Sequence, residues 1–352
     1  MNGQKTPAAL GYRMPPEWHL HSATWLAWPK DPVTWPDRVP QVQEIFLKMI
    51  SALAPHETVH LLVDDEWIEN DVRDRLKRNT QMPDDYAHDV VFHRIPTVDS
   101  WIRDYGPNFI SRSDAQLAYN DWDFNAWGNK YEELKRDNDI PALLEGFLQV
   151  PRFQPGIVLE GGSIEVDGAG VCMTTEQCLL NPNRNPQLGR SQIEQYLMDY
   201  LGVEKFLWLG EGIAGDDTDG HIDDLARFAS PNTVVCTMEE DPQDENYKPL
   251  HDNYRRLQRA TSVRGAPYEI VILPMPGSLV DSEGKRLPAS YTNFYVANNV
   301  VLVPTFGHPN DARALELLQK MFPTRKVIGI HCEPLVWGMG AIHCVTQQQP
   351  AP

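Results

Sequence analysis

The chain has 352 residues, of which 41 % are apolar and 10 are Trp, enough to bury a large core, which argues against a disordered chain. Its formal net charge of −18 disfavours binding to nucleic acid or to anionic lipid. The same charge would attract a cationic ligand, although solubility alone explains it as well.

Cysteine usage and the lack of an apolar span indicate where the protein works. The 5 Cys residues are odd in number, follow no metal-finger spacing and have no signal peptide before them, so we expect no disulfides. No apolar stretch approaches the roughly 20 residues that cross a bilayer. We therefore expect a cytoplasmic protein with no membrane or nucleic-acid partner, and a homo-oligomer stays open.

The length suits either several average domains or one large α/β domain. No low-complexity linker divides the sequence, so we expect a single domain over residues 1–352, with residues 1–12 as a flexible N-terminus.

A unit of strand, polar loop, helix and strand is visible near the start of the chain. Apolar residues recur at three- and four-residue spacing over residues 42–53, which predicts an amphipathic helix ending before Pro55. An apolar run at residues 24–28 precedes this helix, and a β-rich run at residues 58–63 follows it.

The same order recurs further along the chain, and Ser191 and Glu194 are spaced as a capping box for one of its helices. Repetition of such a unit favours stacked layers or a closed ring, because one unit alone leaves an apolar face uncovered. Irregular spacing keeps an ordinary mixed α/β domain as an alternative. The further copies are expected at residues 117–119, 140–148 and 152 (the weakest); 171–174, 191–201 and 206–209; 234–237, 247–261 and 270–273; and 300–304, 311–322 and 327–330.

Short charged segments flanked by glycine are candidate sites, because loops at strand ends often carry catalytic groups. Residues 101–107 read Trp-Ile-Arg-Asp-Tyr-Gly-Pro, and residues 159–163 read Leu-Glu-Gly-Gly-Ser. Taken alone, a surface turn with a local salt bridge explains the first, and a plain β-turn explains the second.

The segment at residues 215–224, Gly-Asp-Asp-Thr-Asp-Gly-His-Ile-Asp-Asp, is harder to explain as a plain turn. Its carboxylates repel one another unless a cation, a metal or an imidazolium offsets them, so it indicates a binding site. Gly215 stands where the first ligand of an EF-hand would be, which excludes that calcium loop, but a Mg²⁺ or Mn²⁺ site stays an alternative.

Cys344 lies in a glycine-bearing segment, residues 337–347. A lone cysteine is usually a small buried hydrophobe, yet a thiol that converges with a histidine and several acids is a candidate nucleophile.

Five motifs, in this order, resemble those of agmatine deiminases and bacterial peptidylarginine deiminases. The resemblance implies an α/β fold of five ββαβ units, a pseudo-symmetric propeller around a central active site, as in guanidine-modifying enzymes. The chain departs from the family pattern at Met339 and Ala341, where a glycine run and an Asn are typical, which leaves substrate identity less secure. The motifs are Trp101 to Pro107, Glu160 to Gly162, Asp219 to Asp223, Tyr291 to Tyr295 and Ile342 to Cys344.

The same resemblance implies the chemistry. Cys344 would attack the guanidinium carbon, His221, oriented by Glu160, would move protons, and Asp104 and Asp223 would clamp the guanidinium nitrogens. Agmatine would yield N-carbamoylputrescine and ammonia through a thiouronium intermediate, in putrescine and polyamine biosynthesis, with no metal and no cofactor.

Further residues are candidates for binding the small cationic substrate. Trp101 and Trp122 could wall its aliphatic chain, although core packing explains both as well, Asp217 could face its distant ammonium, and Asn293 and Gly340 would complete the site. The alternatives are a deiminase of arginine, free or in peptides, and a divalent-metal binding protein that uses the acidic segment at residues 215–224.

Overall fold

A computed structural model describes residues 5–78 and 89–351. Within these residues the strands form five separate sheets, four with three strands and one with four. In every sheet one strand pairs antiparallel and the next pairs parallel with the same middle strand. In strand order the sheets are β16 (Gln347–Pro350), β1 (His21–Ala27), β2 (Thr58–Val63) and β3 (Val90–Arg94); β4 (Asn108–Ser111), β5 (Leu117–Asn120) and β6 (Arg152–Phe153); β7 (Glu165–Val166), β8 (Val171–Thr175) and β9 (Lys205–Leu209); β10 (Ala226–Ser230), β11 (Thr233–Met238) and β12 (Glu269–Pro274); and β13 (Tyr295–Val296), β14 (Val300–Thr305) and β15 (Lys326–His331).

A helical crossover joins the middle strand that makes the antiparallel pair in each sheet to its parallel partner, as parallel pairing requires. In the four-stranded sheet a further crossover, which contains α2 (Glu66–Arg78), joins β2 to β3. The five crossovers of the first kind correspond to the predicted units. Four of these five use one long helix each, and the fifth uses three short turns, so the five predicted strand–helix–strand units are confirmed. The long helices are α1 (Val39–Leu53), α8 (Arg190–Leu201), α9 (Tyr247–Gln258) and α10 (Asn310–Met321), and the short turns are η3 (Glu133–Asp139), α5 (Ile140–Leu143) and α6 (Glu145–Leu148).

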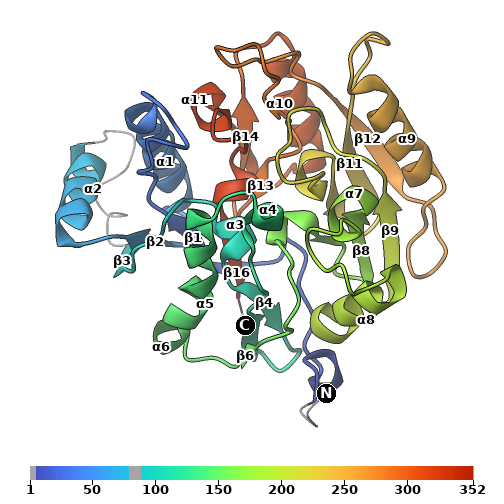
Figure 1. Ribbon diagram of the computed structural model, residues 1–352, viewed down its shortest axis with the longest axis horizontal. Coiled ribbons are helices and arrows are strands. Elements are labelled where there is room, and N and C mark those ends of the chain that lie inside the picture. The colour runs from blue at the N-terminus through green and yellow to red at the C-terminus, as the bar shows by residue number, and fades with distance from the viewer. Residues whose placement is uncertain (1–4, 79–88, 352) are drawn as a thin grey trace.

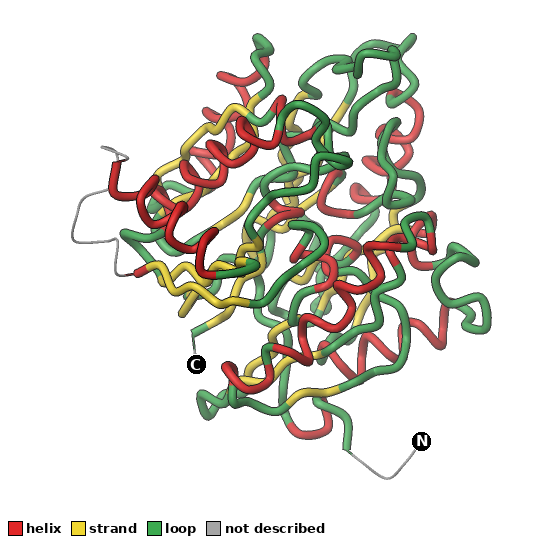
Figure 2. Tube along the Cα trace, turned by 60° about the vertical axis from the view of Figure 1, so that its left-hand side comes forward, coloured by secondary structure: helices red, strands yellow, loops and turns green. Residues whose placement is uncertain are grey.

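The long helices lie on the outside. In Figure 1, α1, α8, α9 and α10 lie at the periphery, whereas α3 (Ile102–Tyr105) and α4 (Ala126–Asn129) lie near the middle. Figure 2 shows the same relation from another side, with the red helices outside the yellow strands. Each helix buries one apolar stripe; in α8 that stripe is Ile193, Leu197 and Leu201.

The predicted start of α8 is wrong. Gly189, not Ser191, is the N-cap, and its N–H donates to the side chain of Gln192 at 2.9 Å. Glu194 instead accepts a bond from the indole of Trp208 at 2.8 Å. The local pattern assigned Glu194 to the helix cap, but in the folded protein its side chain bonds Trp208 instead.

A short turn immediately precedes the first antiparallel strand of each sheet. These turns contact one another, α3 with η4 and η6, and η4 with η5, so the loops before five different strands converge in the interior. The turns are α3 before β4, η4 (Gly161–Ser163) before β7, η5 (Ile222–Asp224) before β10, residues 290–293 before β13, and η6 (His343–Val345) before β16.

The N-terminal segment is partly buried. Residues 1–4 lie outside the described part; of the rest of the expected flexible segment, residues 8–10 form η1 (Ala8–Leu10), and Tyr12 is buried. Glu17, further along, is only 5 % exposed.

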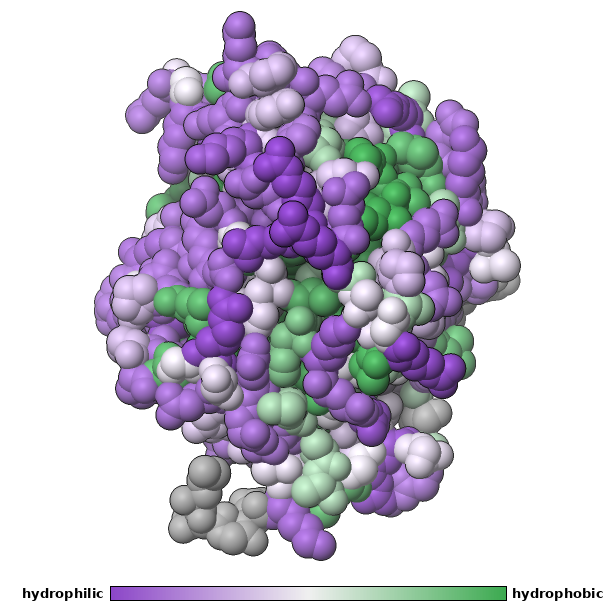
Figure 3. All heavy atoms as spheres, turned by 90° about the vertical axis from the view of Figure 1, so that its right-hand side faces the viewer, coloured by the Kyte–Doolittle hydropathy of each residue, from purple (hydrophilic) through white to green (hydrophobic). Residues whose placement is uncertain are grey.

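The face shown in Figure 3 is mainly hydrophilic, with smaller hydrophobic patches. No helix among the described residues is both long enough and apolar enough to span a bilayer. The remaining helices are α7 (Glu176–Leu179) and α11 (Glu333–Val336).

A histidine pair links the two parallel strands β2 and β3. His60 Nδ1 and His93 Nε2 share a hydrogen bond of 2.8 Å, and both rings stack on Trp25. Burial, with the neighbouring His93, lowers the pKa of His60 to about 4. The folded protein therefore keeps this imidazole neutral where an unfolded chain would protonate it.

We predict that the free energy of unfolding falls as the pH drops from about 6.5 to about 4, because in this window the unfolded chain binds a proton that folded His60 does not. In His60→Gln the fall should be smaller by on the order of 2 kcal/mol. Urea denaturation of both proteins across this range measures it, and parallel curves would contradict it.

Candidate active site

Cys344 lies in η6 with its thiol among amide and carboxylate groups. The side chain is 5 % exposed, and Asn293 Nδ2 donates to Sγ at 3.1 Å. Asn293 Oδ1 accepts from the N–H of His343 at 2.9 Å and of Cys344 at 3.4 Å. One buried amide thus fixes both the turn and its thiol.

The surroundings of the thiol oppose its ionisation. Burial raises the pKa of Cys344 well above its ordinary value, and the charges of Asp223, Asp224 and Asp104 raise it further. The thiol is therefore neutral near pH 7 unless a positive charge comes close.

Asp104 and Asp223 approach the thiol from two different turns, α3 and η5. Asp223 Oδ2 lies 3.7 Å from Cys344 Sγ, while its Oδ1 is buried and has no hydrogen-bond partner among residues 5–78 and 89–351. Asp104 accepts from Gly162 N and from Trp127 Nε1, both at 2.9 Å. Both carboxylates are thus held in place, and Asp223 keeps one oxygen for a further donor.

Glycine is required between these groups. A Cβ atom on Gly162 would lie 2.6 Å from His221 Nδ1, 2.9 Å from Asp104 Oδ1 and 3.1 Å from Asp223 Oδ2. A side chain at position 162 would therefore push apart three of the converging groups.

His221 lies beside Asp104 and Glu160. Its Nδ1 is 3.7 Å from Asp104 Oδ1, and its Nε2 is 4.0 Å from Glu160 Oε2. Burial lowers the pKa of His221, but Asp104, the neighbouring Cys178 and Glu160 together outweigh burial and raise it well above the ordinary value. The ring is therefore an imidazolium near neutral pH, a proton donor inside the protein.

Glu160 is fully buried and anchored through one oxygen. Arg184 Nε donates to Glu160 Oε1 at 2.6 Å, while Oε2 has no hydrogen-bond partner and faces His221. Arg184 also bonds Asp219 at 2.6 Å, which ties the acidic segment to the site.

A cavity of about 520 Å³ opens onto the thiol. Asp104 and Cys344 line it, whereas Asp223, His221 and Glu160 lie behind its wall. The carboxylates on its surface are Asp31, Asp99, Asp104, Glu132, Glu133 and Asp217, and Lys130 is the one cation among its described lining residues.

Trp101, Gly340 and Asp217, three of the predicted binding residues, line this cavity, as do Trp127 and Met339. A Cβ on Gly340 would lie 2.6 Å from the Trp101 ring and 3.2 Å from Cys344 Sγ, so this glycine leaves room for the indole next to the thiol.

Of the two explanations open for Trp122, a substrate wall or core packing, the position of the side chain agrees with core packing. Trp122 packs in a separate core cluster against Tyr200, with its Nε1 donating to Asn108 at 3.2 Å. Trp127 lines the cavity instead, and its Nε1 donates to Asp104. This contact depends on the folded structure, so the sequence around Trp122 gives no sign of it.

The carboxylates of the acidic segment at residues 215–224 find hydrogen-bond and ion-pair partners within the protein, most of them outside the segment. These carboxylates bond to different protein groups and not to one common point. Asp216 accepts from the backbone N–H of Gly220 at 2.6 Å, Asp219 pairs with Arg184 and Lys130, and Asp223 bonds His343. Asp217 accepts from Tyr131 and lies 3.6 Å from Lys130.

Comparison with known proteins agrees with this geometry. Residues 13–350 match the sequence model of the Porphyromonas-type peptidyl-arginine deiminases. The agmatine deiminase of Medicago truncatula is 37 % identical, and the alignment covers 100 % of both chains. The solved agmatine deiminase of Enterococcus faecalis superposes with a TM-score of 0.90 at 35 % identity, over 99 % of this chain and 98 % of that one.

A more distant structure, an amidinotransferase from Microseira wollei, shares the fold with a TM-score of 0.53 at 11 % identity, over 96 % of this chain and 97 % of that one. The mixed α/β fold expected of a guanidine-modifying enzyme is thereby supported. Because the family model matches residues 13–350, the chain belongs to the Porphyromonas-type peptidyl-arginine deiminase family.

Proposed function

We propose that this protein hydrolyses the guanidinium group of agmatine to N-carbamoylputrescine and ammonia, a step of putrescine biosynthesis. The observation that carries the proposal is a thiol at the end of an acidic cavity, 3.7 Å from a buried carboxylate whose other oxygen has no partner. A planar cation with several N–H donors fits such a carboxylate. The relatives named agmatine deiminase support the choice of substrate.

Binding is the first step. Asp104 and Asp223 accept hydrogen bonds from the guanidinium nitrogens and turn the central carbon toward Cys344. The arriving positive charge lowers the cost of ionising the thiol, which the surrounding carboxylates otherwise oppose. The thiol proton leaves to solvent through the cavity, because protonated His221 cannot take it, and one proton returns to the thiolate at the end of the cycle. The substrate thus helps to generate the thiolate that attacks it.

Covalent catalysis follows, because the resonance-stabilised guanidinium carbon is a poor target for water. The Cys344 thiolate forms an S–C bond, and a C–N bond breaks as His221 gives its proton to the departing ammonia. Neutral His221, oriented by Glu160, then takes a proton from water; the hydroxide adds to the thiouronium carbon, and the thiolate leaves. No step of this scheme uses a metal or a cofactor.

Agmatine rather than arginine is favoured by the charges of the cavity. An α-carboxylate needs a free cation, and Lys130, which lines the cavity, is already paired with Asp217 and Asp219. Asp217 and the other lining acids suit the distant ammonium of agmatine, and Trp101 suits its aliphatic chain.

The proposal extends to the whole chain. Residues 1–352 would form one domain, with the five sheets as a pseudo-symmetric propeller and the five turns at its centre; the contacts of α3 with η4 and η6 support this arrangement. A cytoplasmic location is supported by the five cysteines, which are all free and all within the described residues.

A divalent-metal site in the acidic segment is less well supported, because its carboxylates bond Arg184, Lys130, His343 and backbone amides. Of the two alternatives, deimination of arginine stays the closer one, because it would use the same thiol and clamp.

We predict that the purified protein turns over agmatine at least about a hundredfold faster, in kcat/KM, than arginine or a blocked arginine peptide. Cys344→Ser should abolish turnover while the protein still binds agmatine, because a hydroxyl is far less nucleophilic than a thiolate. Colorimetric detection of the ureido product and calorimetric titration measure the two effects.

The controls for this experiment are activity in EDTA and the variant Cys236→Ser, a buried thiol outside the site. Full activity in both is expected. Loss of activity in EDTA would support the metal alternative. If the protein prefers arginine or the peptide, that compound rather than agmatine is its substrate.

We also predict that Asp104→Asn and Asp223→Asn each cost about 3 kcal/mol of transition-state stabilisation, over a hundredfold in kcat/KM. The double substitution should cost much less than the sum, because one remaining arm no longer aligns the carbon. Steady-state kinetics of the four proteins give the coupling, and simple additivity would assign the two carboxylates independent roles.

The raised pKa of Cys344 predicts its reactivity. Inactivation by neutral iodoacetamide should keep accelerating with pH beyond the range in which an ordinary thiol reaches its plateau, near about 8.5. A cationic chloroacetamidine should react faster at neutral pH, because its charge favours the thiolate. A plateau below pH 8 with iodoacetamide would show that the carboxylates do not hold the thiol protonated.

A further inference from the structure

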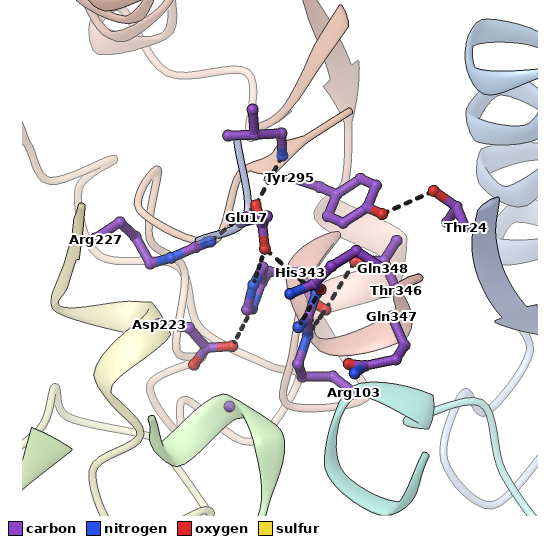
Figure 4. A network of polar contacts seen from close by, with 12 residues as sticks. Glu17, Thr24, Arg103, Asp223, Arg227, Tyr295, His343, Thr346, Gln347 and Gln348 are labelled. Carbon is purple, nitrogen blue, oxygen red and sulfur yellow. Dashed lines mark hydrogen bonds and ion pairs between the residues drawn. The ribbon is translucent and has the colours of Figure 1, made fainter. Parts of the chain in front are cut away.

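Behind Asp223 lies a chain of buried charged groups to which the catalytic scheme assigns no part. His343 Nδ1 is 2.7 Å from Asp223 Oδ2, and His343 Nε2 is 2.7 Å from Glu17 Oε2. The three side chains are at most 4 % exposed. Figure 4 shows His343 between the two carboxylates, with Arg227 reaching Glu17 from one side.

We propose that His343 and Glu17 are positioning residues of the reaction: His343 bridges the two carboxylates and holds Asp223 so that its second oxygen meets the substrate. This inference rests on the proposed function, in which Asp223 binds the guanidinium.

The hydrogen-bonding chemistry defines the state of the chain. Carboxylates accept, so a ring held between two of them must donate from both nitrogens, which makes His343 an imidazolium. Burial raises the pKa of Glu17, but Arg227 and His343 outweigh burial and hold it far below its usual range. The pKa of Asp223 is also lowered, because its bond to His343 outweighs burial.

Further cations complete the balance around Glu17. Arg227 Nη2 lies 2.9 Å from Glu17 Oε1, and its Nε donates to Glu165 at 2.8 Å. Arg103 Nη2 lies 3.4 Å from Glu17 Oε2. Glu17 is therefore the acceptor at which His343, Arg227 and Arg103 meet, although it stands outside every motif of the sequence.

The consequence for the site follows from how the oxygens of Asp223 are used. His343 holds Oδ2, and Oδ1 has no partner among the described groups. Without His343, this buried carboxylate could rotate or take up a proton, and either change removes an oriented acceptor for the guanidinium. His343 also precedes Cys344 directly, so one residue sets the clamp relative to the nucleophile.

A purely structural role is the rival explanation, and pH distinguishes the two. In His343→Gln, Asp223 loses its imidazolium; of the charged groups that face it, His221 and Arg227 remain favourable, whereas Asp104, Asp224 and the Cys344 thiolate oppose ionisation. The pKa of Asp223 should rise, so activity that needs the carboxylate is lost at low pH and partly returns as the pH is raised.

The test is the pH profile of kcat/KM for agmatine with the full-length wild type, His343→Gln and Glu17→Gln. For His343→Gln we expect a loss of at least about a hundredfold near neutral pH and an acid limb shifted upward by about one unit. Glu17→Gln keeps the shape of the side chain but replaces one acceptor oxygen with an NH₂ group that faces other N–H donors. We expect it to lower kcat/KM at least about tenfold.

Asp167→Asn is the matched control. This carboxylate is also buried, but it accepts from the backbone N–H of Ala169 and Val171 in the turn between β7 and β8. It should lose stability in urea denaturation without a shift of the acid limb. Unfolding midpoints of all variants separate loss of fold from loss of positioning.

A background with Asp223→Asn gives a second readout. There, Glu17→Gln should change kcat/KM less than twofold, because the group through which it acts is already neutral. If the wild type turns over agmatine but folded His343→Gln and Glu17→Gln keep its rate and pH profile, the positioning role is wrong and the proposed function stands. If the wild type prefers another guanidinium substrate, the same variants tested on that substrate decide the positioning role separately.

Discussion

Everything at this site depends on holding several buried carboxyl groups next to one thiol. Burying a charge costs several kcal/mol unless it is paired and hydrogen-bonded. The protein meets this constraint by anchoring one oxygen and sparing the other: Arg184 holds Glu160 and His343 holds Asp223, and in both cases the second oxygen has no partner. The second oxygen of Glu160 faces His221, and the second oxygen of Asp223 is available to orient a guanidinium.

The fold delivers these groups because its five units repeat. Each sheet begins with an antiparallel strand, and the turn before that strand carries one part of the site: Asp104, Glu160, the pair His221 and Asp223, Asn293, or Cys344. Equivalent positions of equivalent units therefore meet in the interior. The long helices cover the outside and leave the turns free to differ in chemistry.

Periodicity was sufficient to predict the crossover helices and the parallel strand pairs, and the ordered motifs predicted which residues converge. The antiparallel strands were not predicted; β7 and β13, with two residues each, are too short to show a pattern. For Trp122 the sequence left a substrate wall and core packing equally open, because whether an indole lines a cavity or a core depends on packing between sheets. Glu17 and Arg184 were missed because their roles come from long-range ion pairs, and no local sequence signal accompanies those.

The pairing of β16 with β1 has a consequence for how the enzyme comes into being. This sheet joins the two ends of the described chain, and Glu17 meets His343 across 326 residues. A nascent chain can build the units around α8, α9 and α10 from nearby sequence, yet under the proposed mechanism it lacks its nucleophile until residue 344 leaves the ribosome. Closing so long a loop is slow compared with local helix formation. Catalytic competence is thus a property of the finished polypeptide, and no partly synthesised chain can consume substrate.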